Sequence, residues 1–272
     1  MSMSAAPDHA PEDIEQCERS AQVGELTCHV EDAPPPDASV RQRDADLFRG
    51  FGLKPGDFAD GLVVDVGAGP YLRTKYFRDA QIAVIEPLAD EYRRQAPWSD
   101  LNDAAAVYSQ PAEQSVAELL GQAACVLSLN AIDHAFEPWR ILANMRSYLK
   151  PDGLMLVSVD VHDVDEDDLH PVALTPALLT ELAVNAGLAI ERRYLYTPHG
   201  RNYGHGFAYT IVARPRAAGE PDGSDSPLIP LRSTGQLAWE EISDRAGSVA
   251  RRVKRVVTGE SRTVKRWLGK AA

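Results

Sequence analysis

Two carboxylates and two glycines in the first half of the chain have a spacing typical of a nucleotide-binding turn. Asp65 lies near the end of a valine-rich run, and Gly67 and Gly69 follow it. Glycine allows positive φ angles and lets a ligand approach the backbone closely. A second apolar run, residues 82–85, leads to Glu86, which stands 21 positions after Asp65 (86 − 65). In a βαβ unit this spacing places an acid at the ribose hydroxyls of a nucleotide. The pattern therefore predicts a site for an adenosine-containing cofactor.

The residues around this turn favour a cofactor without phosphates. A dinucleotide site has a third glycine at the position that Leu72 occupies here. Asp65 would repel a pyrophosphate, whereas it would attract an amine or a sulfonium. No Gly-Lys-Ser/Thr follows the turn, so a P-loop is excluded. These features indicate S-adenosylmethionine, which carries both cations and no phosphate.

The motif Asp65-x-Gly67-x-Gly69, together with Glu86, resembles the first two motifs of the class I S-adenosylmethionine-dependent methyltransferases. The resemblance extends over about residues 55 to 215. It implies a Rossmann-like α/β fold: a seven-stranded, mostly parallel sheet with helices on both faces and an antiparallel last strand. It also implies that Asp65 holds the amino-acid end of the cofactor, while Glu86 holds the ribose.

Residues 107–113, Val-Tyr-Ser-Gln-Pro-Ala-Glu, resemble the third-strand motif of this family. In that motif an Ala-Glu pair lies beside the adenine. The resemblance therefore implies that the backbone N–H of Ala112 reaches the adenine ring, with Glu113 next to it. Pro111 stands where many relatives have an aspartate, which removes one contact to the exocyclic amine.

An apolar run over residues 124–129 leads into Asn130-Ala-Ile-Asp-His134, and Lys-Pro-Asp-Gly follows at residues 150–153. This order resembles the fourth and fifth motifs of the group that includes quinone- and small-molecule-modifying enzymes, and it adds Asn130 to the predicted cofactor site. His134 follows the fourth strand and is a candidate general base; the alternative is a structural histidine at a helix start. His170, in a loop after the fifth strand, is the second catalytic candidate.

The sequence predicts no metal site and no disulfide. The acidic residues around positions 160–165 could hold a divalent cation, but a solvated loop is the simpler interpretation. Cys17, Cys28 and Cys125 are too few and too irregularly spaced for a metal or disulfide framework. Reduced thiols, the lack of a signal-peptide pattern at the start and the lack of a long apolar run predict a cytoplasmic protein.

Composition divides the chain into four parts. Residues 1–38, rich in Ala, Pro, Asp and Glu, predict a disordered or loosely docked arm. Residues 39–215 form the methyltransferase-like domain, which begins with a helix over residues 39–52 capped by Ser39. Residues 216–243 predict a linker. Residues 244–272 form a basic amphipathic tail.

The tail carries nine Lys or Arg and two Asp or Glu, whereas the whole chain has a formal charge of −12. Such an acidic body does not favour nucleic acid as a partner. The tail itself fits three interpretations: a helix packed on its own domain or on a partner, a contact with nucleic acid, or a peripheral contact with anionic lipid at the inner face of the membrane.

The sequence thus predicts a methyltransferase, and O-methylation of a small-molecule, glycan or lipid-linked acceptor is the leading hypothesis. The Pro-Pro-aromatic motif typical of nucleic-acid amino-methyltransferases is absent after residue 129, and Cys125 lies too early for carbon-5 pyrimidine chemistry. The alternative is a non-catalytic protein of the same fold that acts through its basic tail. A nicotinamide-dependent oxidoreductase is disfavoured by Asp65 and Leu72.

Overall fold

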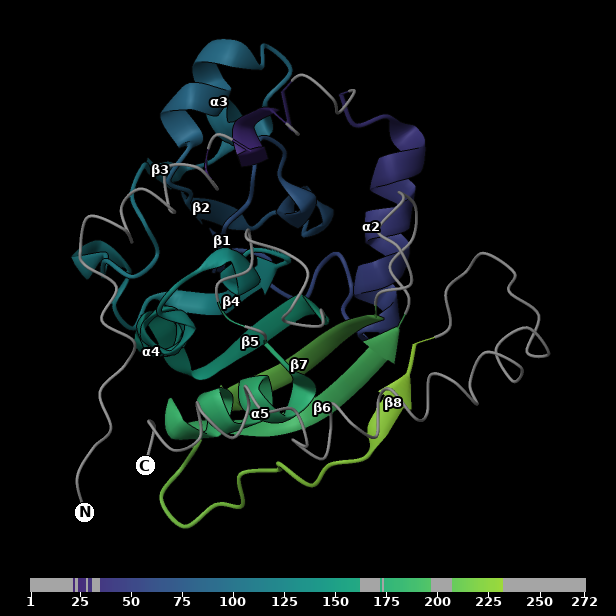
Figure 1. The fold of residues 1–272 in the computed structure, drawn as a ribbon, viewed down its shortest axis with the longest axis vertical. Helices are drawn as coiled ribbons and strands as arrows, with labels where there is room; N and C mark the ends of the chain where they lie inside the picture. The colour runs from purple at the N-terminus through teal and green to yellow at the C-terminus, as the bar shows by residue number, and fades with distance from the viewer. Residues whose placement is uncertain are drawn as a thin grey trace, which may run out of the picture.

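The computed structural model describes residues 22, 24–27, 29–30, 35–161, 172, 174–196 and 207–231. Their centre is one eight-stranded sheet with the strand order β3-β2-β1-β4-β5-β7-β6-β8 (Figure 1). The strands are β1 (Leu62–Val66), β2 (Gln81–Ile85), β3 (Ala106–Tyr108), β4 (Ala123–Leu129), β5 (Leu149–Val161), β6 (Leu188–Tyr196), β7 (Phe207–Pro215) and β8 (Leu228–Pro230).

The pairing confirms the predicted mixed sheet. β1 pairs in parallel with both β2 and β4, β3 extends the parallel part beside β2, and β5 extends it beside β4. β7 is antiparallel to both β5 and β6. The sheet has one strand more than the expected seven, because the short β8 adds in parallel to β6. The chain reverses its winding direction between β1 and β4, and in such sheets the ligand crevice lies at the carboxyl ends of those two strands.

Helices cover both faces of the sheet, as predicted (Figure 1). Successive strand residues point to opposite faces, so Val63 and Val64 of β1 enter different cores. Val64 joins the core formed with α4 (Pro138–Tyr148) and α5 (Pro176–Asn185), whereas Val63 joins the core under α2 (Ala38–Gly50). A third cluster joins α3 (Ala89–Gln95) to β2. Four 3₁₀ helices complete the described elements: η2 (Arg73–Tyr76), η3 (Asp100–Asp103), η4 (Ala117–Leu119) and η5 (Ile132–His134).

The helix termini follow local rules, with one correction to the sequence analysis. Thr175 caps α5 by accepting the Leu178 N–H at 3.1 Å, and Pro176 occupies the first turn, as the sequence predicts. The cap of α2 is Asp37 rather than Ser39: its Oδ1 accepts the Ser39 and Val40 N–H groups at 2.8 and 3.0 Å. Asp37 is the cap because it lies two residues before Ser39, where its carboxylate reaches two amides of the first turn at once.

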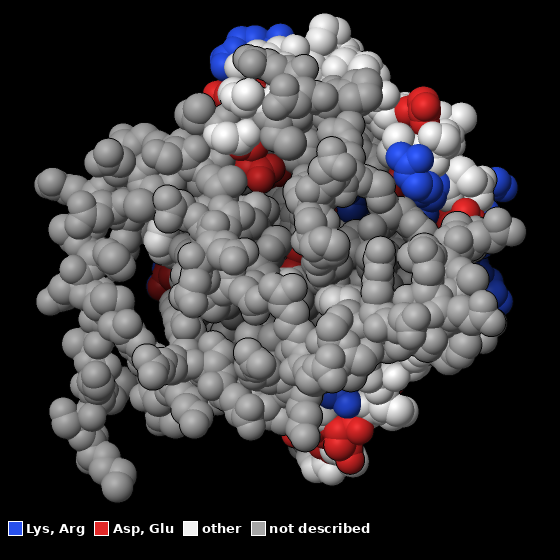
Figure 2. All heavy atoms as spheres, turned by 45° about the vertical axis from the view of Figure 1, so that its right-hand side comes forward, with Lys and Arg blue, Asp and Glu red and all other residues white. Residues whose placement is uncertain are grey.

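The outer parts of the chain are described only in pieces. The predicted arm, residues 1–38, is helical at 24–27 and 29–30. Within the predicted linker, residues 228–230 form β8. The basic tail at 244–272 lies outside the described residues. In the described part of the chain, none of the helices has the length and apolar character needed to cross a membrane. Figure 2 shows acidic and basic side chains interspersed on the described surface.

Candidate active site

The turn after β1 has the conformation that its glycines predict. Gly67 and Gly69 have φ angles of 71° and 64°, which side chains rarely tolerate. At Gly67 space is also limiting, because an added Cβ would lie 2.2 Å from the Cβ of Ala131, in the loop after β4. The Gly67 N–H donates to the Ile85 carbonyl at 2.9 Å. The two loops at the crevice therefore meet at Gly67, and only glycine fits there.

Glu86 faces this turn from the end of β2. Its carboxylate is buried and accepts two backbone amides at 3.0 Å, from Gly69 and from Leu88. Burial raises the pKa of Glu86, while the two N–H donors oppose the shift. The structure thus brings together Gly69 and Glu86, which the sequence analysis assigned to one site.

Asp65 lies at the end of β1 with only 4% of its surface exposed. The Thr74 hydroxyl donates to its Oδ2 at 2.8 Å. Burial raises the pKa of Asp65 to about 7, against the effects of the Thr74 hydrogen bond and the nearby Arg73 guanidinium. A buried carboxylate whose charge has so little compensation favours a cationic neighbour.

Asn130 and His134 follow β4 at the same edge of the sheet. Asn130 has a positive φ of 56°, and its Oδ1 accepts the Asp160 N–H from β5 at 3.3 Å. His134 lies in η5 with 20% of its side chain exposed, and its Nε2 is 3.6 Å from a carboxylate oxygen of Glu25. The sequence pattern does not identify Glu25 as a partner of His134. The two residues are distant in sequence, and the N-terminal composition predicts a disordered or loosely docked arm.

The loop after β3 is fixed by α4. The Asn144 side-chain amide donates to the carbonyl oxygens of Ala112 and Glu113, at 2.9 and 3.0 Å. These bonds hold the backbone of the two residues that the resemblance places beside the adenine. His170, the second catalytic candidate, lies outside the described residues.

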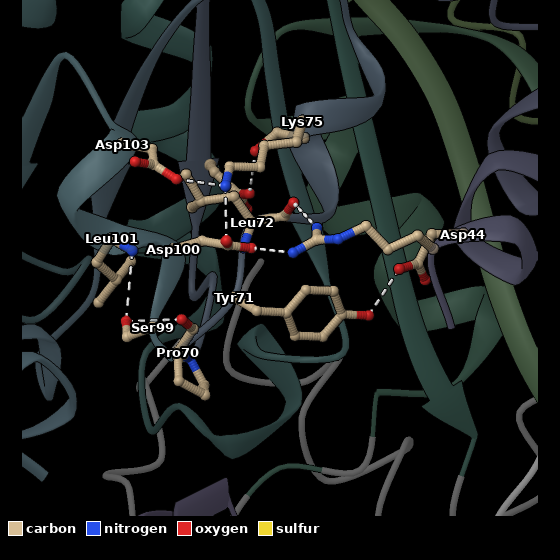
Figure 3. A network of polar contacts seen from close by, with 12 residues as sticks. Asp44, Pro70, Tyr71, Leu72, Lys75, Ser99, Asp100, Leu101 and Asp103 are labelled. Carbon is tan, nitrogen blue, oxygen red and sulfur yellow. Dashed lines mark hydrogen bonds and ion pairs between the residues drawn. The ribbon is translucent and has the colours of Figure 1, made fainter. Parts of the chain in front are cut away.

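A polar network holds the chain that follows the glycine turn (Figure 3). Asp100 is buried and accepts the Leu72 N–H at 3.2 Å, the Arg41 guanidinium at 2.5 Å and the Lys75 ammonium at 2.6 Å. Burial opposes ionisation of Asp100, but the hydrogen bonds from Lys75 and Arg41 outweigh it and lower the pKa. Ser99 adds a hydrogen bond from its hydroxyl to the Pro70 carbonyl at 2.7 Å. Nothing in the local sequence pattern identifies Asp100 as the centre of this network.

Tyr71 connects the same network to α2. Its hydroxyl donates to Asp44 at 2.6 Å, and the guanidinium carbons of Arg41 and Arg73 lie 5.4 and 5.9 Å from the centre of its ring. These distances are within the range of cation–π interactions. The α2 helix is thereby tied to the cofactor turn by charge as well as by its apolar face.

Outside this site, the described residues include a buried cysteine and one further cavity but no group of metal-ligating side chains. In the residues that the structure describes, no three His, Cys, Asp or Glu side chains gather as metal ligands. Cys125 is buried in β4, and burial raises the pKa of its thiol. A cavity of about 470 Å³ between α5 and β6–β8 contains none of the predicted site residues.

The described residues fit S-adenosylmethionine by the chemistry of their donors. Asp65 and Glu86 supply two buried carboxylates at adjacent strand ends. They lie next to the turn that contains Gly67 and Gly69. Among the described residues, the nearest atoms to a Cβ added at Gly69 belong to the His29 ring, at 3.9 Å, so these residues leave space for a ligand beside the turn. Carboxylates match the amine of the cofactor and its ribose hydroxyls.

A family model described as a methyltransferase domain matches residues 40–211. The chain belongs to this methyltransferase family. The methyltransferase also shares its fold with the 1,6-didemethyltoxoflavin-N1-methyltransferase of Burkholderia thailandensis, whose crystal structure holds 1,6-didemethyltoxoflavin and S-adenosylhomocysteine. The two are 18% identical with a TM-score of 0.55, over 79% of this chain and 95% of that one. S-adenosylmethionine is accordingly the cofactor of this enzyme.

Two further solved structures share the fold. The [4+2]-cyclase SpnF is 15% identical with a TM-score of 0.53, over 74% of this chain and 96% of that one. A putative methyltransferase from Bacillus halodurans is 13% identical with a TM-score of 0.51, over 64% of this chain and 100% of that one. The comparison with curated proteins gave no match.

The raised pKa of Asp65 predicts how the stability of the cofactor-free enzyme depends on pH. In the folded protein the pKa of Asp65 is about 7, which lies above the ordinary aspartate pKa of 3.8. Between these two pH values the folded state therefore binds more protons than the unfolded state. Stability therefore falls as pH rises from 4 to 7. Asp65→Asn removes this loss, so its melting temperature relative to wild type should increase between pH 5 and pH 8. Asp90→Asn, an exposed change on α3, is the control, and an equal response of both variants would contradict the assignment.

The network around Asp100 predicts an unequal effect of two similar substitutions. Asp100→Asn should lower the free energy of unfolding by about 1–3 kcal/mol, because a buried acceptor for three donors loses its charge. Asp103→Asn removes the other partner of Lys75, but that side chain is 61% exposed, so the loss should stay below about 1 kcal/mol. Urea unfolding of both variants measures the difference, and equal losses would show that Asp100 is not the centre of the network.

Proposed function

We propose that this methyltransferase methylates a hydroxyl group on a small-molecule, glycan or lipid-linked acceptor. The observation that carries the proposal is the His134 imidazole, half-buried at the carboxyl end of β4 and paired with a carboxylate at 3.6 Å. An imidazole in this setting suits removal of a hydroxyl proton near neutral pH. A hydroxyl needs such a base more than an amine does, since a neutral amine already presents a lone pair.

The cofactor residues have distinct roles in this proposal. Asp65 binds the amino-acid end of S-adenosylmethionine, and Glu86 binds its ribose in place of the Gly69 and Leu88 amides that it now accepts. Gly69 leaves room for the ligand, as its positive φ angle and the space beside it support, while Gly67 lets the loop after β4 approach closely. The loop at Ala112 and Glu113 and the turn at Asn130 bound the site on either side.

When bound, S-adenosylmethionine supplies the electrophilic methyl group. The protein contributes alignment of the two reactants, which can lower the reaction barrier by about 7–11 kcal/mol in well-oriented reactions. In our proposal His134 takes the proton of the acceptor hydroxyl during the transfer, and the cofactor would leave as neutral S-adenosylhomocysteine. His170 is the second catalytic candidate. No metal is part of the proposal.

A second candidate is a non-catalytic binding or scaffold protein of this fold that acts through its basic tail. The likeness to SpnF, described as a [4+2]-cyclase, supports this candidate, because it shows that the fold also occurs in a protein that is not named a methyltransferase. In this case the basic tail would carry the interaction with a partner or with anionic lipid. Nucleic acid stays disfavoured by the acidic composition of the chain.

Cofactor binding tests the roles of the carboxylates. Glu86→Gln should weaken S-adenosylhomocysteine binding about 10- to 100-fold, because a charge-assisted pair of hydrogen bonds is lost. The amide keeps one oxygen that accepts the Gly69 N–H but loses the acceptor of the Leu88 N–H, so the melting temperature of the free variant is measured alongside. Glu91→Gln on α3, which removes a surface carboxylate paired with Arg94, is the matched control. Calorimetry measures both, and unchanged affinity in Glu86→Gln would refute the ribose assignment.

Methyl transfer tests His134. With labelled S-adenosylmethionine and hydroxyl-bearing acceptors from cell extract, His134→Gln should lower the rate about 10²–10⁴-fold and leave cofactor binding intact. Activity equal to wild type would remove His134 as a base. Cofactor binding without transfer to any acceptor, in the wild-type enzyme, would favour the second candidate.

A further inference from the structure

An N-terminal segment is docked beside the cofactor turn, although composition predicts an arm. Its described residues, 24–27 and 29–30, are helical and lie beside α3 in Figure 1. Leu26 and Val30 pack against the cluster that joins α3 to β2. The His29 ring stands edge-on to Tyr92 of α3, with centroids 6.0 Å apart and an interplanar angle of 88°. These contacts place the segment at the carboxyl ends of β1 and β2.

His29 faces the open side of the turn. Its ring provides the nearest atoms, at 3.9 Å, to the position that a side chain on Gly69 would occupy. It also lies close enough to Glu86 for its charge to lower the pKa of that carboxyl. His29 therefore lies beside the hydrogen-bonded pair of Gly69 and Glu86, where the ribose binds in the proposed function.

Glu25 connects this histidine to the catalytic candidate. One of its carboxylate oxygens is 3.1 Å from Nε2 of His29, and the other is 3.6 Å from Nε2 of His134. A carboxylate beside an imidazole N–H fixes the ring orientation and selects the tautomer. In our proposal His134 directs its Nε2–H toward the Glu25 carboxylate, which leaves the lone pair of the neutral ring on Nδ1. That nitrogen is then the one that accepts a proton.

We propose that Glu25, Leu26, His29 and Val30 form the outer wall of the cofactor site, in which His29 contacts bound cofactor and Glu25 is a positioning residue for His134. This inference rests on the proposed function, since it assumes the cofactor site at Gly69 and Glu86. It assigns to the N-terminal segment a part in the reaction: one carboxylate sets the geometry of both the cofactor end and the acceptor end of the crevice.

Calorimetry with S-adenosylhomocysteine tests the wall on the full chain. His29→Ala should weaken binding about 3- to 10-fold, the loss of one polar contact. Thr27→Ala, on the exposed side of the same segment, is the matched control and should bind like wild type. Equal affinities of the two variants would overturn the wall while leaving the proposed function in place. Absence of binding by the unaltered chain would overturn both.

The tautomer of His134 tests Glu25 without an acceptor. In ¹⁵N spectra, the His134 resonances, identified by their loss in His134→Gln, should show Nε2–H in the wild-type enzyme and a mixture of tautomers in Glu25→Ala. Thr27→Ala should keep the wild-type spectrum. Identical His134 resonances in Glu25→Ala and wild type would overturn the positioning role. A lower kcat in Glu25→Ala at saturating S-adenosylmethionine would support it further.

Discussion

The structure depends on a constraint at one turn: the backbone after β1 must stay open to a ligand and yet keep its polar groups paired. A long helix after the turn would satisfy these groups internally, but here only η2 follows. Side chains take over that task, as Asp100 accepts the Leu72 amide and Ser99 donates to the Pro70 carbonyl. Since unpaired buried amides are costly, the position of the turn is tied to η3 and, through Arg41, to α2.

The same edge of the sheet holds buried negative charge. Burial raises the pKa of both Asp65 and Glu86, and among the described residues the hydrogen-bond donors to these carboxylates are neutral: the Thr74 hydroxyl and the Gly69 and Leu88 amides. The cost of burying these charges is offset when a cationic, hydroxyl-rich ligand takes their bonds. The buried carboxylates therefore lower the stability of the free protein and raise its affinity for the ligand. Such a balance is common at sites that are formed before the ligand binds.

The fold that this protein shares with its structural relatives does not by itself define a reaction, since those relatives carry different reaction names. The sheet order and the glycine turn belong to the shared frame, and they provide a place for the cofactor. In the proposed function, the acceptor end is bounded by the 3₁₀ turn with His134, by the Asn130 bridge to β5 and, through Glu25, by the N-terminal segment. Any account of what is methylated has to start from those parts.

The sequence by itself determined the frame. Valine-rich runs, paired glycines and an acid 21 positions after Asp65 (86 − 65) suffice to predict a parallel sheet with a cofactor turn, because strand burial and positive φ are local demands on residue type. Only the tertiary structure decided the rest. Asp100 as the centre of a network, the contact of Gly67 with Ala131 and the pairing of Glu25 with His134 join residues far apart in the chain. Such pairings depend on how elements pack, and no periodicity or spacing in the sequence encodes them.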